Sequence, residues 1–92
     1  MTVKQKIDDI VEQLGCIGIV PVIKLEKVEN AEKLAKALRD GGINCAEVTF
    51  RAAGADKVIS RMVKAYPDML VGAGTVLTCE QADAAYAAGA KF

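Results

Sequence analysis

The sequence contains no histidine and no tryptophan, and its only aromatic residues are two tyrosines and two phenylalanines. The absence of histidine excludes the Ser–His and Cys–His nucleophile systems from this chain, together with the commonest transition-metal ligand. Twelve basic and twelve acidic residues cancel. No basic, aromatic-rich surface is therefore expected, and we expect no nucleic-acid partner. Any chemistry in this chain must use carboxylate, hydroxyl, lysine or arginine groups.

Long apolar runs and paired cysteines are also missing. No run approaches the ~20 apolar residues of a membrane span, and residues 1–14 are amphipathic and charged, unlike a signal peptide. We therefore expect a cytoplasmic protein without membrane contact. Cys16, Cys45 and Cys79 are an odd number without C-x-x-C spacing, which favours reduced, individually buried thiols over a disulfide framework.

Apolar residues follow helical and strand periods in turn along the chain. The helical period predicts four helices: residues 3–14, Asn30 to Gly41, a helix closed by Pro67, and one from a Thr78–Gln81 capping box to Gly89. The strand pattern predicts residues 17–23, 45–50 and 69–73, and residues 90–92 resemble the start of a fourth strand. This alternation predicts an α/β fold with a parallel sheet.

The last predicted strand begins at Ala90, only three residues before the final Phe92. Three or four parallel strands would leave two open edges and an incompletely covered inner face. We therefore expect residues 1–92 to form a single partial domain of a larger protein, present as a truncated or proteolysed chain. A flatter, doubly wound sheet is an alternative, because three βα units do not require closure into a barrel.

The segment AEVTFR, residues 46–51, alternates polar and apolar side chains. In a strand, Glu47, Thr49 and Arg51 share one face, while Val48 and Phe50 meet the helices on the other. If the sheet closes into a barrel, the polar face points inward, and its last residue reaches the end where barrel enzymes place their sites. A carboxylate withdrawn from water there suits proton transfer. A buried Glu–Arg pair without a catalytic role, or a wet edge strand, remains open.

The segment Gly72-Ala73-Gly74-Thr75 lies between a predicted strand and a predicted helix. A dinucleotide fingerprint would need a third glycine, so we interpret the segment as a tight βα turn whose amides could hold a carboxylate or phosphate. Thr75 would place its hydroxyl at the same end of the sheet. Lys24 follows the first predicted strand and is interpreted as a solvated lysine.

Four segments together resemble the N-terminal part of the 2-keto-3-deoxy-6-phosphogluconate (KDPG) and 4-hydroxy-2-oxoglutarate (KHG) aldolase family: VPVI (20–23), LAKALRDGG (34–42), AEVTFR (46–51) and VGAGTV (71–76). The resemblance runs through essentially the whole chain. It implies part of a (β/α)8 TIM barrel: an N-terminal helix, three βα units and the start of a fourth strand. It also implies a homotrimeric class I aldolase that forms a lysine Schiff base and splits KDPG to pyruvate and glyceraldehyde 3-phosphate without metal or another cofactor.

Carried over by position, the resemblance implies that Glu47 is the general acid/base and that Arg51 engages the substrate carboxylate. Thr75, with Gly74 before it, would lie beside the pyruvate carboxylate. The Schiff-base lysine and phosphate loops belong to later strands of the family, so we expect this chain alone to be inactive. The preferred 2-keto-3-deoxy sugar acid stays open. A hypothesis of another class is a stand-alone βα-repeat module that holds an anion at residues 72–75 and self-associates through its open edges.

Overall fold

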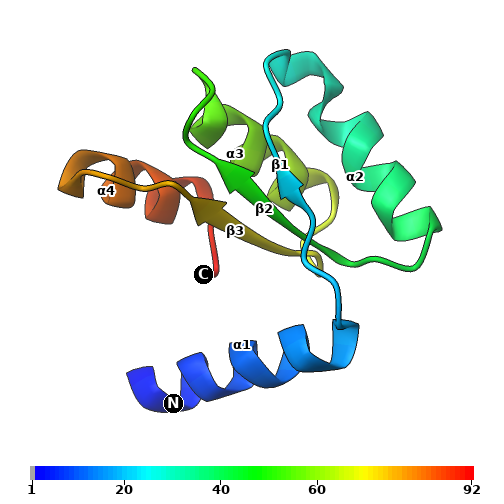
Figure 1. The fold of residues 1–92 in the computed structure, drawn as a ribbon, viewed down its shortest axis with the longest axis vertical. Helices are drawn as coiled ribbons and strands as arrows, with labels where there is room; N and C mark the ends of the chain where they lie inside the picture. Colours follow the sequence, from blue (N-terminus) through cyan, green and yellow to red (C-terminus); the bar gives the residue numbers. More distant parts are fainter. Residues whose placement is uncertain (1) are drawn as a thin grey trace.

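A computed structural model describes residues 2–92 of the chain. Helices and strands alternate in the order α1 (Val3–Ile17), β1 (Val22–Ile23), the 3-10 turn η1 (Val28–Asn30), α2 (Ala31–Asp40), β2 (Cys45–Thr49), α3 (Ala55–Ala65), β3 (Leu70–Gly74) and α4 (Cys79–Ala88). The three strands are parallel, in the spatial order β1-β2-β3 (Figure 1). The predicted α/β fold with a parallel sheet is confirmed.

The hydrophobic core lies between one face of the sheet and the helices α2 and α3. Its buried residues come from both layers: Ala31, Ala35, Val58, Ile59 and Met62 from the helices, and Ile23, Ala46, Val48 and Val71 from the strands. Consecutive helices on one face, with strands in sequential order, are the winding of a barrel. A doubly wound sheet reverses its strand order and moves helices to the second face, and neither occurs among the three strands of residues 2–92.

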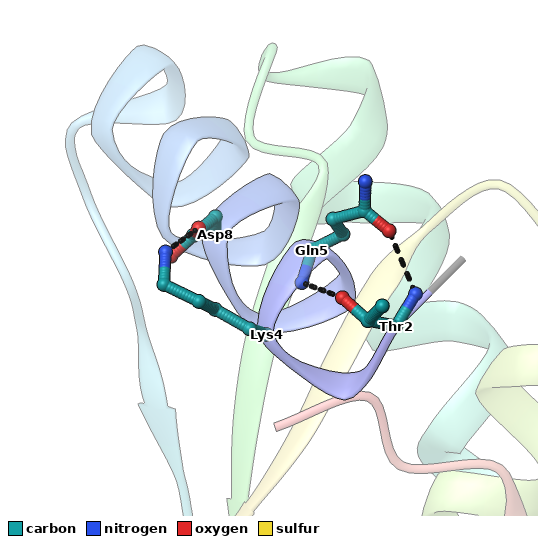
Figure 2. A network of polar contacts seen from close by, with 4 residues as sticks. All are labelled: Thr2, Lys4, Gln5 and Asp8. Carbon is teal, nitrogen blue, oxygen red and sulfur yellow. Dashed lines mark hydrogen bonds and ion pairs between the residues drawn. The ribbon is translucent and has the colours of Figure 1, made fainter.

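Helix α1 lies apart from the sheet and buries no residue (Figure 1). It begins with a complete capping box, in which Thr2 Oγ1 accepts from the Gln5 amide at 3.1 Å and Gln5 Oε1 accepts from the Thr2 amide at 2.7 Å (Figure 2). Lys4 and Asp8 form an ion pair one turn on, at 2.8 Å. This confirms the predicted start of the helix.

The predicted end of α1 and start of β1 are wrong. The helix passes through Gly15 and ends at Gly18, whose φ of 81° is the left-handed conformation that glycine adopts at low cost. Strand β1 is therefore two residues long, in place of the predicted 17–23. Pro21, which has no N–H, stays outside the assigned strand, although its carbonyl accepts from the Glu47 amide at 2.8 Å. Val22 is 60% exposed, because its face of the sheet lies opposite the helices, so β1 is not covered on both faces.

The remaining elements agree with prediction to within a residue or two at their ends. Strand β2 ends one residue earlier than predicted, and β3 is shifted by one residue. Beyond α4, the Lys91 amide donates to Val71 O and the Ala73 amide donates to Phe92 O, each at 2.8 Å. Residues 90–92 thus begin to pair alongside β3, in the place expected for a fourth parallel strand.

The capping of α4 is only half as predicted. Thr78 Oγ1 accepts from the Gln81 amide at 3.1 Å, as expected for an N-cap. The Gln81 side chain, however, accepts from the Leu77 amide at 2.7 Å and not from that of Thr78. The reciprocal bond of the box is therefore displaced by one residue.

Two of the three cysteines contradict the expectation of buried thiols. All three are free, but only Cys45 is buried, while Cys16 and Cys79 are exposed. Cys16 lies on α1, which packs no residue into the core, and Cys79 is the first residue of α4, at the surface.

Within residues 2–92, no helix combines the length and the apolar character of a membrane span.

A polar network ties the strand starts together, at the opposite end from the predicted site. Arg39 Nη1 donates to Asn44 Oδ1 at 2.6 Å and to Asp68 Oδ1 at 2.8 Å, and its guanidinium stacks over Tyr66, 4.7 Å from the ring centre. Asn44 Nδ2 donates to the Asp68 carbonyl at 3.2 Å. The network links the end of α2 to the segments that enter β2 and β3.

Shortening a core side chain at Ile59 should measurably destabilise this fold. Ile59 is fully buried between α3 and the sheet. Ile59→Val removes one methylene from a packed site, and we expect a loss of about 0.5–1.5 kcal/mol in the free energy of unfolding. Urea denaturation followed by circular dichroism measures the change. Ile7→Val on exposed α1 is the matched control and should shift stability by less than about 0.5 kcal/mol. Equal effects at the two positions would contradict the assigned core.

Candidate active site

The side chains of β2 divide between the two faces of the sheet. Ala46 and Val48 join the core, and Phe50 packs against it from just beyond the strand. Glu47 and Thr49 therefore point to the opposite face, away from α2 and α3. Arg51 follows the strand and bonds to Thr49 on that same side. The predicted division of AEVTFR between two faces is confirmed.

A hydroxyl and guanidinium cluster joins the carboxyl ends of β2 and β3. Thr49 is only 1% exposed, and its Oγ1 accepts from Arg51 Nε at 3.1 Å and from the Arg51 backbone amide at 3.3 Å. The same oxygen lies 3.2 Å from Thr75 Oγ1, just beyond the end of β3. Thr49 is the one buried polar residue among residues 2–92, and these three contacts satisfy its hydroxyl.

Glu47 lies one layer deeper than this cluster, against the backbone of β3. Its Cα pairs in register with Gly72, and its side chain leans along β3 towards Gly74. A Cβ built on Gly74 would lie 2.7 Å from Glu47 Cδ and 3.1 Å from Cγ, and it would overlap the carboxylate oxygen. The carboxylate thus occupies space that glycine leaves free.

The Glu–Arg pair considered as an architectural alternative is not formed. Neither Glu47 nor Arg51 takes part in an ion pair within residues 2–92. Glu47 is half-buried, and Arg51 is exposed apart from its bonds to Thr49. Both charged groups are therefore available to a ligand at this end of the sheet.

Thr75 has an unusual backbone. Its φ of 53° lies in the left-handed region, and no other non-glycine residue among 2–92 has a positive φ. For a β-branched residue this conformation is strained by about 1–3 kcal/mol. Such strain is concentrated at functional sites, and here it occurs where the threonine hydroxyl meets Thr49. The sequence carries no signal for this conformation.

The interpretation of Gly72 to Thr75 as a tight turn is wrong for its first three residues. Both glycines lie within β3, and neither has a positive φ. Their role is to keep space free on the face that carries Glu47. Gly74 leaves room for the Glu47 carboxylate, and a Cβ on Gly72 would overlap the ring of Phe92. The turn conformation falls on Thr75 instead.

The other polar groups near this face do not join the cluster. The buried Cys45 thiol donates to the Ile19 carbonyl at 3.1 Å, and burial raises its pKa, so it stays a neutral thiol and a poor nucleophile. Lys24 is half exposed beside Glu26, at 3.6 Å, as the solvated-lysine interpretation predicted. Within the part of the chain that the structure describes, no group of three or more acidic or cysteine side chains could hold a metal ion.

Comparison with known proteins gives consistent matches to one family. Residues 9–92 match the sequence model described as KDPG and KHG aldolase. The 2-dehydro-3-deoxy-phosphogluconate aldolase of Treponema pallidum is 52% identical over 83 residues, which are 90% of this chain and 40% of that protein. The KHG/KDPG aldolase of Escherichia coli is 45% identical over 74 residues, 80% of this chain and 35% of that protein. The chain thus spans about 40% or less of the length of these relatives.

Solved structures agree with the sequence matches. The KDPG aldolase of Legionella pneumophila, with pyruvate captured at low pH as a covalent carbinolamine intermediate, superposes with a TM-score of 0.73 at 45% identity, over 77% of this chain and 34% of that one. The KDPG aldolase of Zymomonas mobilis gives a TM-score of 0.73 at 42% identity, over 79% and 35%. The described residues therefore have the fold of part of a (β/α)8 barrel, as predicted.

Proposed function

The chain belongs to the KDPG and KHG aldolase family, and from this premise we propose that it supplies the proton-transfer and carboxylate-binding part of a class I aldolase site. The whole protein would cleave KDPG to pyruvate and glyceraldehyde 3-phosphate without metal or another cofactor. Residues 1–92 would be a single partial domain, the N-terminal portion of the barrel, in a cytoplasmic homotrimer. The closely similar relatives that carry this activity in their names support the proposal.

One structural observation carries the proposal: Glu47, Arg51 and Thr75 converge on one face at the carboxyl ends of neighbouring strands. Arg51 has guanidinium N–H groups that Thr49 does not use, and these suit a carboxylate through paired, charge-assisted hydrogen bonds. Thr75 adds a hydroxyl beside them. A carboxylate bound in this way would hold the neighbouring keto carbon in one orientation. Correct orientation of the reacting groups supplies a large part of an enzyme's rate advantage.

The proton chemistry falls to Glu47. In a class I aldolase, a lysine amine adds to the keto carbon to give a carbinolamine, which loses water to give an imine. The protonated imine then accepts the electron pair of the breaking carbon–carbon bond while the hydroxyl on the departing carbon gives up its proton, so glyceraldehyde 3-phosphate leaves. The enamine that remains takes up a proton, and hydrolysis of the imine so formed releases pyruvate and the lysine. A carboxyl group beside the keto carbon can move protons between the carbinolamine, water and the enamine. The carbinolamine captured with pyruvate in the Legionella pneumophila relative supports this pathway.

Borohydride reduction tests how the work is divided between this chain and the rest of the protein. We place the nucleophilic lysine outside residues 1–92, so incubation of the 92-residue chain with pyruvate and borohydride should give no covalent adduct by intact mass. A chimera in which residues 9–92 replace the aligned part of the Treponema pallidum aldolase should form the adduct and cleave KDPG.

Either of two results would contradict the proposal. A stable adduct on the isolated chain would show that the nucleophile lies within it. A folded chimera without aldolase activity, measured beside the active parent enzyme, would show that these residues do not supply their part of the site. Circular dichroism of the chimera establishes the folding.

A further inference from the structure

We propose that Thr49 is a positioning residue, whose buried hydroxyl orients both Arg51 and Thr75 towards a bound carboxylate. The inference rests on the proposed function for the identity of the ligand, but its geometric part stands on the hydrogen bonds alone. Thr49 lies on the face of the proposed site but does not itself meet a ligand, because it is 1% exposed. It acts through two neighbours that are more accessible.

The direction of each hydrogen bond follows from counting donors and acceptors. A threonine hydroxyl has two lone pairs and one proton. Arg51 Nε–H and the Arg51 amide N–H have no acceptor capacity and both donate to Thr49 Oγ1, so they occupy both lone pairs. The proton of Thr49 is then the only group left for the contact of 3.2 Å to Thr75 Oγ1. Thr49 therefore donates, and Thr75 accepts.

The direction of this hydrogen bond determines which groups Thr75 can present to a ligand. Because its oxygen receives the Thr49 proton, the Thr75 hydroxyl keeps its own proton to donate elsewhere. The Nη groups of Arg51 likewise remain available, since the contact with Thr49 uses Nε and the backbone amide. Two neighbouring groups thus present donors, one of them positively charged, while the Thr75 oxygen keeps one further lone pair. The chemistry that fits is an anion with paired oxygens, and in the proposed reaction that is the substrate carboxylate.

The strained backbone of Thr75 agrees with a positioning role for Thr49. A β-branched residue at φ 53° is held there only if its surroundings stabilise that conformation. The bond from Thr49 is the side-chain contact that joins Thr75 to β2. It spans 26 residues of sequence and links the ends of two strands. Without it, the Thr75 hydroxyl would lose its fixed direction.

Nuclear magnetic resonance on the 92-residue chain tests the inference without requiring catalysis. The chain has three arginines, Arg39, Arg51 and Arg61, so the Nε–Hε signal of Arg51 can be assigned with an Arg51→Lys sample. In the unaltered chain and in Thr49→Ser, we expect a high heteronuclear NOE at Arg51 Nε. In Thr49→Val, which keeps the shape but lacks the hydroxyl, we expect that NOE to fall. In Thr75→Val it should stay high, because Arg51 is bonded to Thr49.

Two results would overturn the inference: an unchanged Arg51 NOE in Thr49→Val, or an equal fall in Thr49→Val and Thr75→Val. If Thr49→Val does not fold, the other two variants still test the inference. A disordered Arg51 signal in Thr49→Ser or in Thr75→Val would overturn it. Titration with pyruvate adds the ligand. Thr49→Val should need about tenfold more pyruvate than the unaltered chain to shift the Arg51 signal, and Thr49→Ser should not. If pyruvate shifts no signal of Arg51 or Thr75 in the unaltered chain, their proposed ligand fails, while the NOE still decides the role of Thr49.

Discussion

Glu47→Gln in the chimera with the Treponema pallidum aldolase is expected to lower kcat for KDPG cleavage about 10²–10⁴-fold. Glutamine has the shape of glutamate and fits the same space against Gly74, but it cannot take up and return a proton. Binding of the substrate carboxylate should change little, because Arg51 and Thr75 are untouched. Pyruvate release, followed by a coupled reduction assay, measures both kcat and KM.

Glu12→Gln is the matched control for this variant. Glu12 is an exposed residue of α1, and it does not belong to the strand ends of β2 and β3 that form the site. The same change of charge there should leave kcat unaltered. A Glu47→Gln chimera with kcat within about threefold of the unaltered chimera would remove Glu47 from the proton-transfer steps, since a general acid or base contributes at least about 10²-fold.

Gly74→Ala should reduce activity through geometry alone. The added Cβ would lie 2.7 Å from Glu47 Cδ, closer than any van der Waals contact, so the carboxylate must move off the β3 backbone. Misplacement of a catalytic group by about 1 Å can cost about 10²-fold in rate. The φ of Gly74 is not positive, so alanine itself is not strained there. We expect kcat to fall about 10²-fold while the circular dichroism spectrum is retained.

Gly15→Ala is the matched control for the added methyl group. Gly15 lies inside α1, and a Cβ there meets no atom within 4 Å. Alanine at this position should leave kcat unchanged and raise helix stability by about 0.5–1 kcal/mol. Full activity in Gly74→Ala would show that the position of Glu47 over Gly74 is not the one used in catalysis.

The sequence predicted the fold well where side-chain periodicity is strong. Strand β2 carries a clear alternating pattern and helix α3 a clear helical one. Both ends of β2 and the C-terminal end of α3 lie close to their predicted positions. The region around β1 failed because two local signals competed. The sequence predicts a helix that ends at residue 14, but the helix continues to its cap at Gly18. The remaining apolar run does not pair as one long strand, because Pro21 has no N–H to donate.

The candidate site was predictable in its members but not in its hydrogen bonds. Strand alternation alone places Glu47, Thr49 and Arg51 on one face, and the carboxyl end of β3 brings in Thr75. The two bonds from Arg51 to the Thr49 hydroxyl are local, but its bond to Thr75 depends on the register between β2 and β3, which a sequence does not give residue by residue. The use of Gly74 as free space for Glu47 depends on the same register, so the glycines were interpreted as a turn.

A crystal structure of the chimera with pyruvate captured on its lysine would test the central claim most directly. The account predicts pyruvate carboxylate oxygens within about 3.2 Å of the Arg51 guanidinium and of Thr75 Oγ1, with the Glu47 carboxylate on the side of the keto carbon. A carboxylate held by other residues, with Arg51 and Thr75 pointing away from the captured pyruvate, would contradict it.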